Sequence, residues 1–222
     1  MTCMTKVICF DLWKTLAREP STMRDYWAPF LKRYPGLVDF DRLGPLVDEL
    51  AMKQPVTLIA AIEHILAAFG IQDAAVTSAV AERWKTSCDR ASLYDDVVPS
   101  LIELRRRGYM LALITNTSAY GWQRLNKVYA LIRYFDIVAK SFTLGTVKPE
   151  PAIFQYVEER CGVFTNNILM VGDSCENDIA PAVARGWRAL QLVRSPDPNS
   201  AAQPGTIKHL TELAAMLYQS DG

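Results

Sequence analysis

Residues 6–16 of this chain read Lys6-Val7-Ile8-Cys9-Phe10-Asp11-Leu12-Trp13-Lys14-Thr15-Leu16. The apolar part of this stretch has the length of a buried strand, and Asp11 stands where that strand should end. Parallel α/β folds bind their ligands at the carboxyl ends of their strands, so we expect Asp11 to be a nucleophile, a metal ligand or both. Two residues later, where a second acid could share the proton transfers, the chain carries Trp13.

The composition of the 222 residues excludes several classes of protein. Half of the residues are hydrophobic, and Lys and Arg together number 24, as do Asp and Glu. This balance favours neither a nucleic-acid partner nor a basic membrane-binding surface. We expect no membrane span and no signal peptide, because the apolar runs are too short. The five cysteines form no Cys-x-x-Cys pair, so we expect a reduced, cytoplasmic protein without disulfides or structural zinc.

The hydrophobic pattern divides the chain into three stretches. Residues 1–17 hold the first strand and its loop, and residues 18–94 are almost wholly helical, with Pro55 at a first helical position. Residues 95–222 alternate between helices and apolar strands, which predicts a parallel sheet covered by helices on both faces. We therefore predict an α/β core domain of residues 1–17 and 95–222. An all-helical cap domain, residues 18–94, is inserted over its active end.

The expected elements follow from the same periodicity. Helices are predicted at residues 24–34, 40–52, 55–69, 74–88, 98–107, 119–131, 151–161, 176–185 and 209–218. Strands are predicted at residues 6–10, 110–114, 137–139, 168–171 and 189–193. Residues 195–205, rich in Pro, Asn, Ala and Ser, are predicted to form a surface loop.

Polar side chains follow several of these strands. Asp11 follows the first predicted strand, Thr115-Asn116 follows the second, and Asp173 and Asp178 follow the fourth. Lys148 lies in the loop between the third and fourth strands. A carboxylate can attack phosphorus, hydroxyl and helix N-terminal N–H groups can hold phosphate oxygens, and a lysine can offset negative charge. Carboxylates from two strand ends can hold Mg²⁺, which prefers oxygen ligands. The pattern is therefore typical of phosphoryl transfer.

In these motifs and their order the chain resembles the haloacid dehalogenase-like (HAD) hydrolase superfamily. The resemblance is to the subfamily with a helical cap between motifs one and two. The four motifs are Asp11-Leu12-Trp13-Lys14-Thr15; Thr115 with Asn116; Lys148; and Gly172-Asp173-Ser174 with Asp178. The resemblance runs over the whole chain and implies a Rossmann-like core. It also implies a Mg²⁺-dependent phosphatase that acts on a small phosphorylated metabolite through an aspartyl-phosphate intermediate. It names no protein partner, and we expect a monomer or a weak homodimer.

The resemblance also implies roles for the motif residues. Asp11 would be the nucleophile and a metal ligand, and the backbone carbonyl of Trp13 would be a second ligand. Asp173 would bind the metal, and Asp178 would support it directly or through water.

The remaining motif residues would act on the substrate. Thr115 and Lys148 would bind the phosphoryl group and take part in catalysis. Asn116 and Trp13 would contribute to substrate binding.

Trp13 departs from the pattern of the family. Family phosphatases usually carry a second Asp there, which acts as general acid to the leaving alcohol and then as general base to water. The indole N–H is only a weak donor and can do neither. General acid–base catalysis is typically worth roughly 10²–10⁴-fold in rate. Three explanations remain open: a good leaving group such as an acyl phosphate or a phenolic ester, an acid supplied by the cap, or weak or lost activity.

The 2-haloacid dehalogenases are the leading alternative, because an aromatic Tyr occupies the position of Trp13 in them. They need no metal, whereas Asp173 and Asp178 without a cation would repel an anionic substrate. The sequence shows no clear match for their halide-binding arginine, for which Arg18 and Arg24 are the nearest candidates.

Two further alternatives stand beside these enzymes. Phosphonatases use a cap lysine that forms a Schiff base, and Lys53 is a candidate by residue type alone. A catalytically weak member that binds a ligand or a protein is the non-enzymatic alternative. Some motif residues also have structural roles open to them: Thr115-Asn116, or Asp173 and Asp178, could simply cap the helices that follow.

Overall fold

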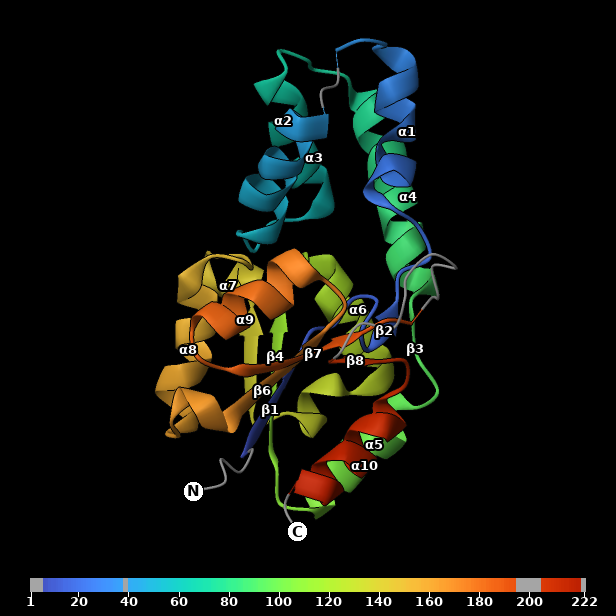
Figure 1. The fold of residues 1–222 in the computed structure, drawn as a ribbon. Helices are drawn as coiled ribbons and strands as arrows, with labels where there is room; N and C mark the ends of the chain where they lie inside the picture. The colour runs from blue at the N-terminus through green and yellow to red at the C-terminus, as the bar shows by residue number, and fades with distance from the viewer. Residues whose placement is uncertain (1–5, 38–39, 195–204, 221–222) are drawn as a thin grey trace.

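A six-stranded parallel sheet forms the centre of the molecule, in the order β5-β4-β1-β6-β7-β8 (Figure 1). The computed structural model describes residues 6–37, 40–194 and 205–220. The strands are β1 (Val7–Phe10), β4 (Met110–Thr115), β5 (Ile137–Lys140), β6 (Ile168–Gly172), β7 (Arg188–Leu192) and β8 (Thr206–Ile207). The predicted α/β fold is confirmed, and every predicted strand is present to within one residue at each end. Only β8 among these strands was not predicted.

Helices cover both faces of the sheet, as the side-chain alternation of β1 requires. Ile8 and Phe10 pack in one hydrophobic cluster with α5 (Val97–Arg106), α6 (Ala119–Tyr129) and α10 (Leu210–Ser220). Val7 and Cys9 point to the opposite face and pack against α8 (Pro151–Cys161) and α9 (Ala180–Ala184). Because both faces are covered, all four residues of β1 are buried.

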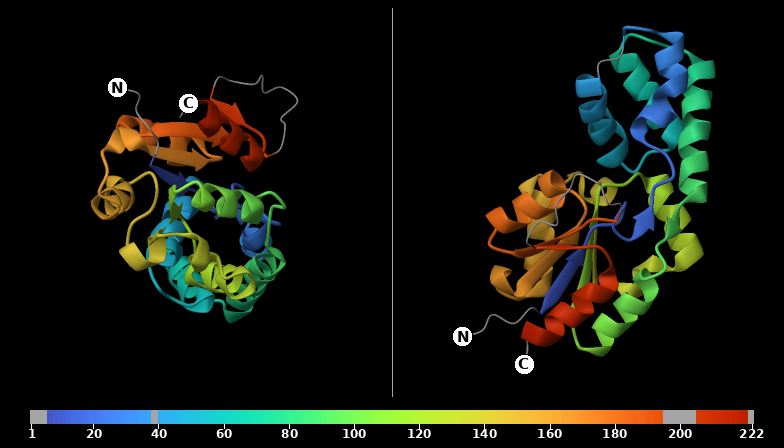
Figure 2. Two further views of the ribbon diagram at one scale, coloured as in Figure 1. Left: turned by 90° about the horizontal axis from the view of Figure 1, so that it is seen from below. Right: turned by 45° about the vertical axis from the view of Figure 1, so that its right-hand side comes forward.

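Four helices stand beyond the edge where the strands end (Figures 1 and 2). They are α1 (Met23–Arg33), α2 (Phe40–Val47), α3 (Leu58–Ala68) and α4 (Ala74–Arg90), with a π-helical turn, η1 (Asp48–Met52), after α2. Their apolar side chains form a cluster that shares no residue with the two clusters of the sheet. This separate core supports the proposed division into a cap and a core domain.

The boundaries of the predicted helices need correction at several points. The prediction that Pro55 begins a helix was wrong, because α3 begins at Leu58 and the Thr57 hydroxyl caps it by accepting from the Ala60 N–H at 3.2 Å. The predicted helix 119–131 ends at Tyr129, where Ala130 takes a left-handed φ of 50°. The predicted helices 40–52 and 176–185 each contain a π-helical turn, which hydrophobic spacing does not distinguish from an α-helix.

Several short elements escaped prediction because two to four residues carry no readable period. They are the antiparallel pair β2 (Ala17–Arg18) and β3 (Ser92–Leu93), the helix α7 (Ser141–Leu144), and the 3₁₀ turns η2 (Leu131–Tyr134) and η3 (Thr165–Asn167). The π-helical turn η4 (Cys175–Ile179) instead overlaps the predicted helix 176–185. Of the predicted loop 195–205, residues 195–204 lie outside the described residues. Within the described ranges, no helix has both the length and the apolar character that crossing a membrane requires.

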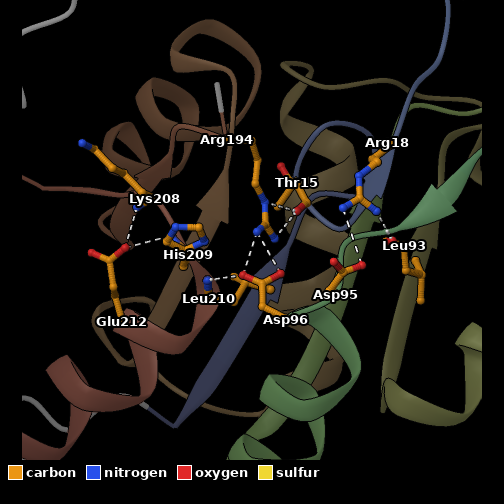
Figure 3. Close-up of polar contacts among 10 residues, drawn as sticks. All are labelled: Thr15, Arg18, Leu93, Asp95, Asp96, Arg194, Lys208, His209, Leu210 and Glu212. Atoms are coloured by element: carbon orange, nitrogen blue, oxygen red, sulfur yellow. Dashed lines mark hydrogen bonds and ion pairs between the residues drawn. The ribbon is translucent and has the colours of Figure 1, made fainter. Parts of the chain in front are cut away.

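Arg194 ties the loop after β1 to the C-terminal part of the sheet (Figure 3). Its guanidinium donates to both carboxylate oxygens of Asp96, at 2.8 and 2.7 Å, and to the carbonyl of Thr15, at 3.1 and 2.8 Å. Asp96 also accepts from the Leu210 N–H at 2.8 Å. The two charged side chains are only 9% and 14% exposed, so this pair is a largely buried brace behind the loop that carries Asp11.

We expect Arg194→Met to lower the free energy of unfolding by about 3 kcal/mol, because the mutation leaves the Asp96 carboxylate largely buried without a cation. Urea denaturation at neutral pH measures the change. Arg106→Met is the matched control: Arg106 pairs with Glu103 on the exposed face of α5 and should change stability little. An equal loss in both variants would contradict the buried brace.

The Arg194–Asp96 pair also determines in which direction the free energy of unfolding changes with pH. Burial acts to raise the pKa of Asp96, but hydrogen bonds from Arg194 and the Leu210 N–H outweigh it, so the pKa lies below its ordinary value. The stabilisation is therefore present above the unfolded-state pKa of Asp, about 3.9, and is lost as the pH falls through the folded-state pKa. The stability difference between wild type and Arg194→Met should narrow below about pH 4.

Candidate active site

Asp11, Lys148 and Asp178 meet at the carboxyl edge of the sheet. The Lys148 ammonium lies 2.5 Å from Asp11 Oδ1 and 2.6 Å from Asp178 Oδ1. All three side chains are buried. Asp11 reaches this point because its N–H donates to the Val171 carbonyl at 3.0 Å, extending the pairing of β1 with β6 by one residue. The structure thus brings together three residues that the sequence analysis assigned to one site.

Hydrogen bonds to neighbouring loop residues hold Lys148 and Asp178 in place. Lys148 is fixed through its backbone, since its N–H donates to Asn116 Oδ1 at 2.8 Å and its carbonyl accepts from Asn116 Nδ2 at 2.9 Å. Asp178 accepts from the Ser174 N–H at 3.1 Å through its other oxygen. A Cβ atom at Gly172 would collide with the Asp178 carboxylate, so the close approach of η4 to the end of β6 requires glycine.

The charges in this cluster are not balanced by the protein. Burial raises the pKa of Asp11 to about 7, with Lys148 opposing the rise and Asp178 and Asp173 adding to it. Burial alone would lower the pKa of Lys148, but the two carboxylates outweigh it and the net pKa is raised. Asp173 has a raised pKa because of burial and the nearby Asp178. One ammonium therefore faces three carboxylates in a region of low dielectric constant.

A divalent cation fits this excess of negative charge. Asp11, Asp173 and Asp178 each offer a carboxylate oxygen, and these atoms lie within 4.8 Å of one another. Asp11 Oδ2 is buried and has no hydrogen-bond partner within the described residues. An all-oxygen donor set of this kind suits Mg²⁺, so the residues present fit the metal that the sequence predicted.

The loop after β4 offers donors for an anion. Thr115 is fully buried, and among the described residues its hydroxyl has no partner. Ser118, not Thr115-Asn116, caps the following helix, since its hydroxyl accepts from the Gly121 N–H at 3.1 Å. The structural alternative for Thr115-Asn116 was therefore wrong. The unpaired hydroxyl and the N-terminus of α6 are suited to phosphate oxygens.

The capping alternative for the fourth motif was also wrong. Ser174 caps η4, because its hydroxyl accepts from the Asn177 N–H at 3.1 Å. Asp178 instead points to Lys148, and Asp173 belongs to the three-carboxylate group. Both acids are thus free to serve a metal.

Trp13 lies in a tight loop whose shape depends on its neighbour. Lys14 has a φ of 61°, in the left-handed region, and its N–H donates to the Ala17 carbonyl at 2.7 Å. A Cβ atom at Gly121 of α6 would lie 3.2 Å from the Trp13 ring, so the indole packs against the start of that helix. No carboxylate occupies this position.

A cavity of about 300 Å³ opens between the loops and the cap helices. Its core side is formed by Trp13, Lys14 and residues 116–118. Its cap side comes from α1, α2, η1 and α4, including Tyr26, Trp27, Asp48 and Trp84. The sequence did not predict that these cap residues line a site. Apolar residues at helical spacing indicate a buried face, and the pattern is the same whether that face fills a core or lines a cavity.

Other candidates from the sequence lie away from this cavity. Lys53 pairs with Glu150 at 2.7 Å and with Glu49 at 3.1 Å, which does not suit a Schiff-base lysine. Arg18 donates to the Leu93 carbonyl at 2.7 Å, and Arg24 stacks over the Phe40 ring at 4.6 Å. None of these three lines the cavity beside Trp13.

The chain is similar to known proteins over most of its length. A family model described as haloacid dehalogenase-like hydrolase matches residues 5–186. Phosphoglycolate phosphatase 1 of Pseudomonas aeruginosa is 30% identical over 199 residues, which cover 73% of this chain and 71% of that protein. The chain spans about half the length of several other curated relatives that it matches, such as the phosphoglycolate phosphatase of Mannheimia succiniciproducens.

Solved structures share the fold. A HAD phosphatase from Thermococcus onnurineus has a TM-score of 0.63 and 25% identity, with 96% of this chain and 98% of that one covered. A 2-haloacid dehalogenase from Pseudomonas syringae has a TM-score of 0.66 and 24% identity, with 97% and 99% covered. The fold therefore does not distinguish the two chemistries.

We expect Gly172→Ala to displace the Asp178 carboxylate and to lower the free energy of unfolding by about 1–3 kcal/mol through overpacking. Chemical denaturation measures the change. Gly44→Ala is the matched control, because a Cβ there meets nothing within 4 Å apart from its chain neighbours and Gly44 lies inside α2. That variant should change the free energy of unfolding by less than about 1 kcal/mol, because Pro45 restricts the residue before it and opposes the gain in helix propensity. Unchanged stability of Gly172→Ala would contradict the close packing of Asp178.

Proposed function

Because the chain belongs to the haloacid dehalogenase-like hydrolase family, we propose that it is a Mg²⁺-dependent phosphatase acting on a small phosphorylated metabolite. The observation that carries this proposal is the buried contact of Lys148 with Asp11 and Asp178, beside Asp173. Three carboxylates around one ammonium suit a metal and a phosphoryl group. Relatives named phosphoglycolate phosphatase support the same class of reaction.

The proposed reaction begins at Asp11. One of its oxygens attacks phosphorus, and the ester oxygen of the substrate leaves with the electrons of the broken P–O bond. Lys148 holds phosphoryl oxygens, with Thr115 and the N-terminus of α6 as further donors. Water then attacks the aspartyl phosphate, which releases inorganic phosphate and restores Asp11.

The metal would be held by Asp11, Asp173 and Asp178, with the Trp13 carbonyl as a further ligand. When bound, Mg²⁺ supplies positive charge that offsets the charge of the transferring phosphoryl group. The chain's own contribution is to hold these carboxylates together and to exclude bulk water beneath the cap.

Trp13 restricts which esters the enzyme can cleave. With no acid at this position, the leaving oxygen receives no proton from motif one, and a strongly basic alkoxide departs slowly. Leaving groups that are stable as anions, such as phenolates and carboxylates, suffer least from this loss. We therefore propose that aryl or acyl phosphates are better substrates than alkyl phosphates.

The dehalogenase alternative is less well supported by the site. Both candidate halide-binding arginines, Arg18 and Arg24, are engaged away from the cavity. Asp173 and Asp178 remain beside Asp11, where without a cation they would repel the carboxylate of a haloacid.

We expect wild-type protein with Mg²⁺ to release phosphate from aryl and acyl phosphates, and chelator to abolish the release. Asp11→Asn should lose more than about 10³-fold in kcat, because it removes the nucleophile. A phosphate-release assay over a panel of esters measures both effects. If no ester is hydrolysed in a Mg²⁺-dependent manner, the phosphatase proposal is wrong, and haloacids and then ligand binding without turnover become the next tests.

We expect Trp13→Asp to raise the ratio of kcat/KM for alkyl phosphates to that for aryl phosphates by at least about tenfold, since it restores an acid at the leaving oxygen. Trp13→Asn is the control, because it removes the same indole volume without supplying a proton. Steady-state kinetics on both ester classes gives the ratio. An equal change in the two variants would show that the effect comes from lost packing.

A further inference from the structure

The cavity beside Trp13 is placed to receive the leaving group, if the proposed phosphatase function holds. Trp13 and Lys14 follow Asp11 within three residues, and Asn116 directly follows Thr115. These loop residues line the cavity and are the sequence neighbours of the nucleophile Asp11 and of Thr115. A phosphoryl group at Asp11 would therefore direct its ester oxygen and the attached group towards this space.

The walls of the cavity are largely aromatic. Tyr26 and Trp84 stack with ring centroids 5.6 Å apart and an interplanar angle of 4°, and Trp13 and Trp27 complete the aromatic lining. A planar aromatic group gains contact area and ring interactions against such walls. The volume of about 300 Å³ suits a single-ring leaving group rather than a large one.

The charges that line the cavity disfavour an anionic leaving group. Lys14 is the one lysine or arginine among the described lining residues. Its Nζ lies 3.7 Å from Glu19 Oε2, and 59% of its side chain is exposed. Glu19 also accepts from the Tyr26 hydroxyl at 3.0 Å. Asp48 adds a second carboxylate to the lining. Acids thus outnumber cations on the lining.

We infer that this protein hydrolyses phosphate esters of uncharged phenols, and that the cavity rejects leaving groups bearing a carboxylate. The P–O bond breaks with its electron pair on the phenolic oxygen, and the resulting phenolate takes a proton from water after release. The ring lies against the aromatic walls, and Asp48 and Glu19 repel a carboxylate. This substrate class also matches the absence of an acid at Trp13.

The first test compares two esters of nearly the same shape, 4-carbamoylphenyl phosphate and 4-carboxyphenyl phosphate. We expect wild-type kcat/KM to favour the neutral amide by at least about tenfold. Asp48→Asn and Glu19→Gln should each bring the ratio closer to one, because each removes a repelling charge. Glu63→Gln is the control: Glu63 is an exposed cap acid that lines a different cavity, and this variant should leave the ratio unchanged.

The second test examines the aromatic walls. Trp84→Leu removes the ring that stacks on Tyr26, so it should lower kcat/KM for phenyl phosphate several-fold relative to acetyl phosphate, which has no ring. A merely structural role of Trp84 would reduce activity on both substrates equally. Such an equal loss would overturn the placement of the ring in this cavity.

Two outcomes separate this inference from the proposed function. If phosphoglycolate or the carboxyphenyl ester is hydrolysed at least as well as the amide, and Asp11→Asn abolishes that activity, the phosphatase stands and the inference is wrong. If neither these esters nor acetyl phosphate is hydrolysed with Mg²⁺, the proposed function fails and the inference fails with it.

Discussion

The site depends on a single buried ammonium that faces more negative charge than it can balance. Lys148 contacts Asp11 and Asp178 at 2.5 and 2.6 Å, and Asp173 adds a third carboxylate within the same group. The sheet forces this crowding, because β1 and β6 are hydrogen-bonded neighbours that end at the same edge. A further cation stabilises such a cluster, and the packing of the strands therefore supports the divalent metal of the proposed function.

The sequence predicted this cluster because residues that directly follow adjacent parallel strands lie close together at one edge of the sheet. Asp11, Thr115 and Asp173 each follow a strand, and β4, β1 and β6 lie side by side. The continuous apolar strands were equally readable, since burial on both faces removes any alternation. The fold class and the contact of Asp11 with Lys148 and Asp178 could therefore be anticipated before any coordinates were known.

The cavity could not be anticipated in the same way. Tyr26, Trp27 and Trp84 occur at helical spacing, and this pattern is the same for side chains that fill a core and for those that line a cavity. Asp48 belongs to a π-helical turn, which no spacing rule separates from the helix before it. Which of these residues face a ligand depends on how the cap lies against the core, and that is a tertiary property.

Trp13 joins the chemistry of the site to its selectivity. An aspartate there would supply a proton and leave the cavity open to poor leaving groups, whereas the indole supplies none and contributes an aromatic wall. In the proposed phosphatase, the indole therefore leaves basic alkoxides to depart slowly and at the same time favours planar groups whose oxygen leaves readily as an anion. Because one residue has both effects, loss of the acid is compatible with a specialised enzyme as well as with a weakened one. The aromatic walls of the same cavity favour the specialised enzyme, since they suit the planar leaving groups that need no proton.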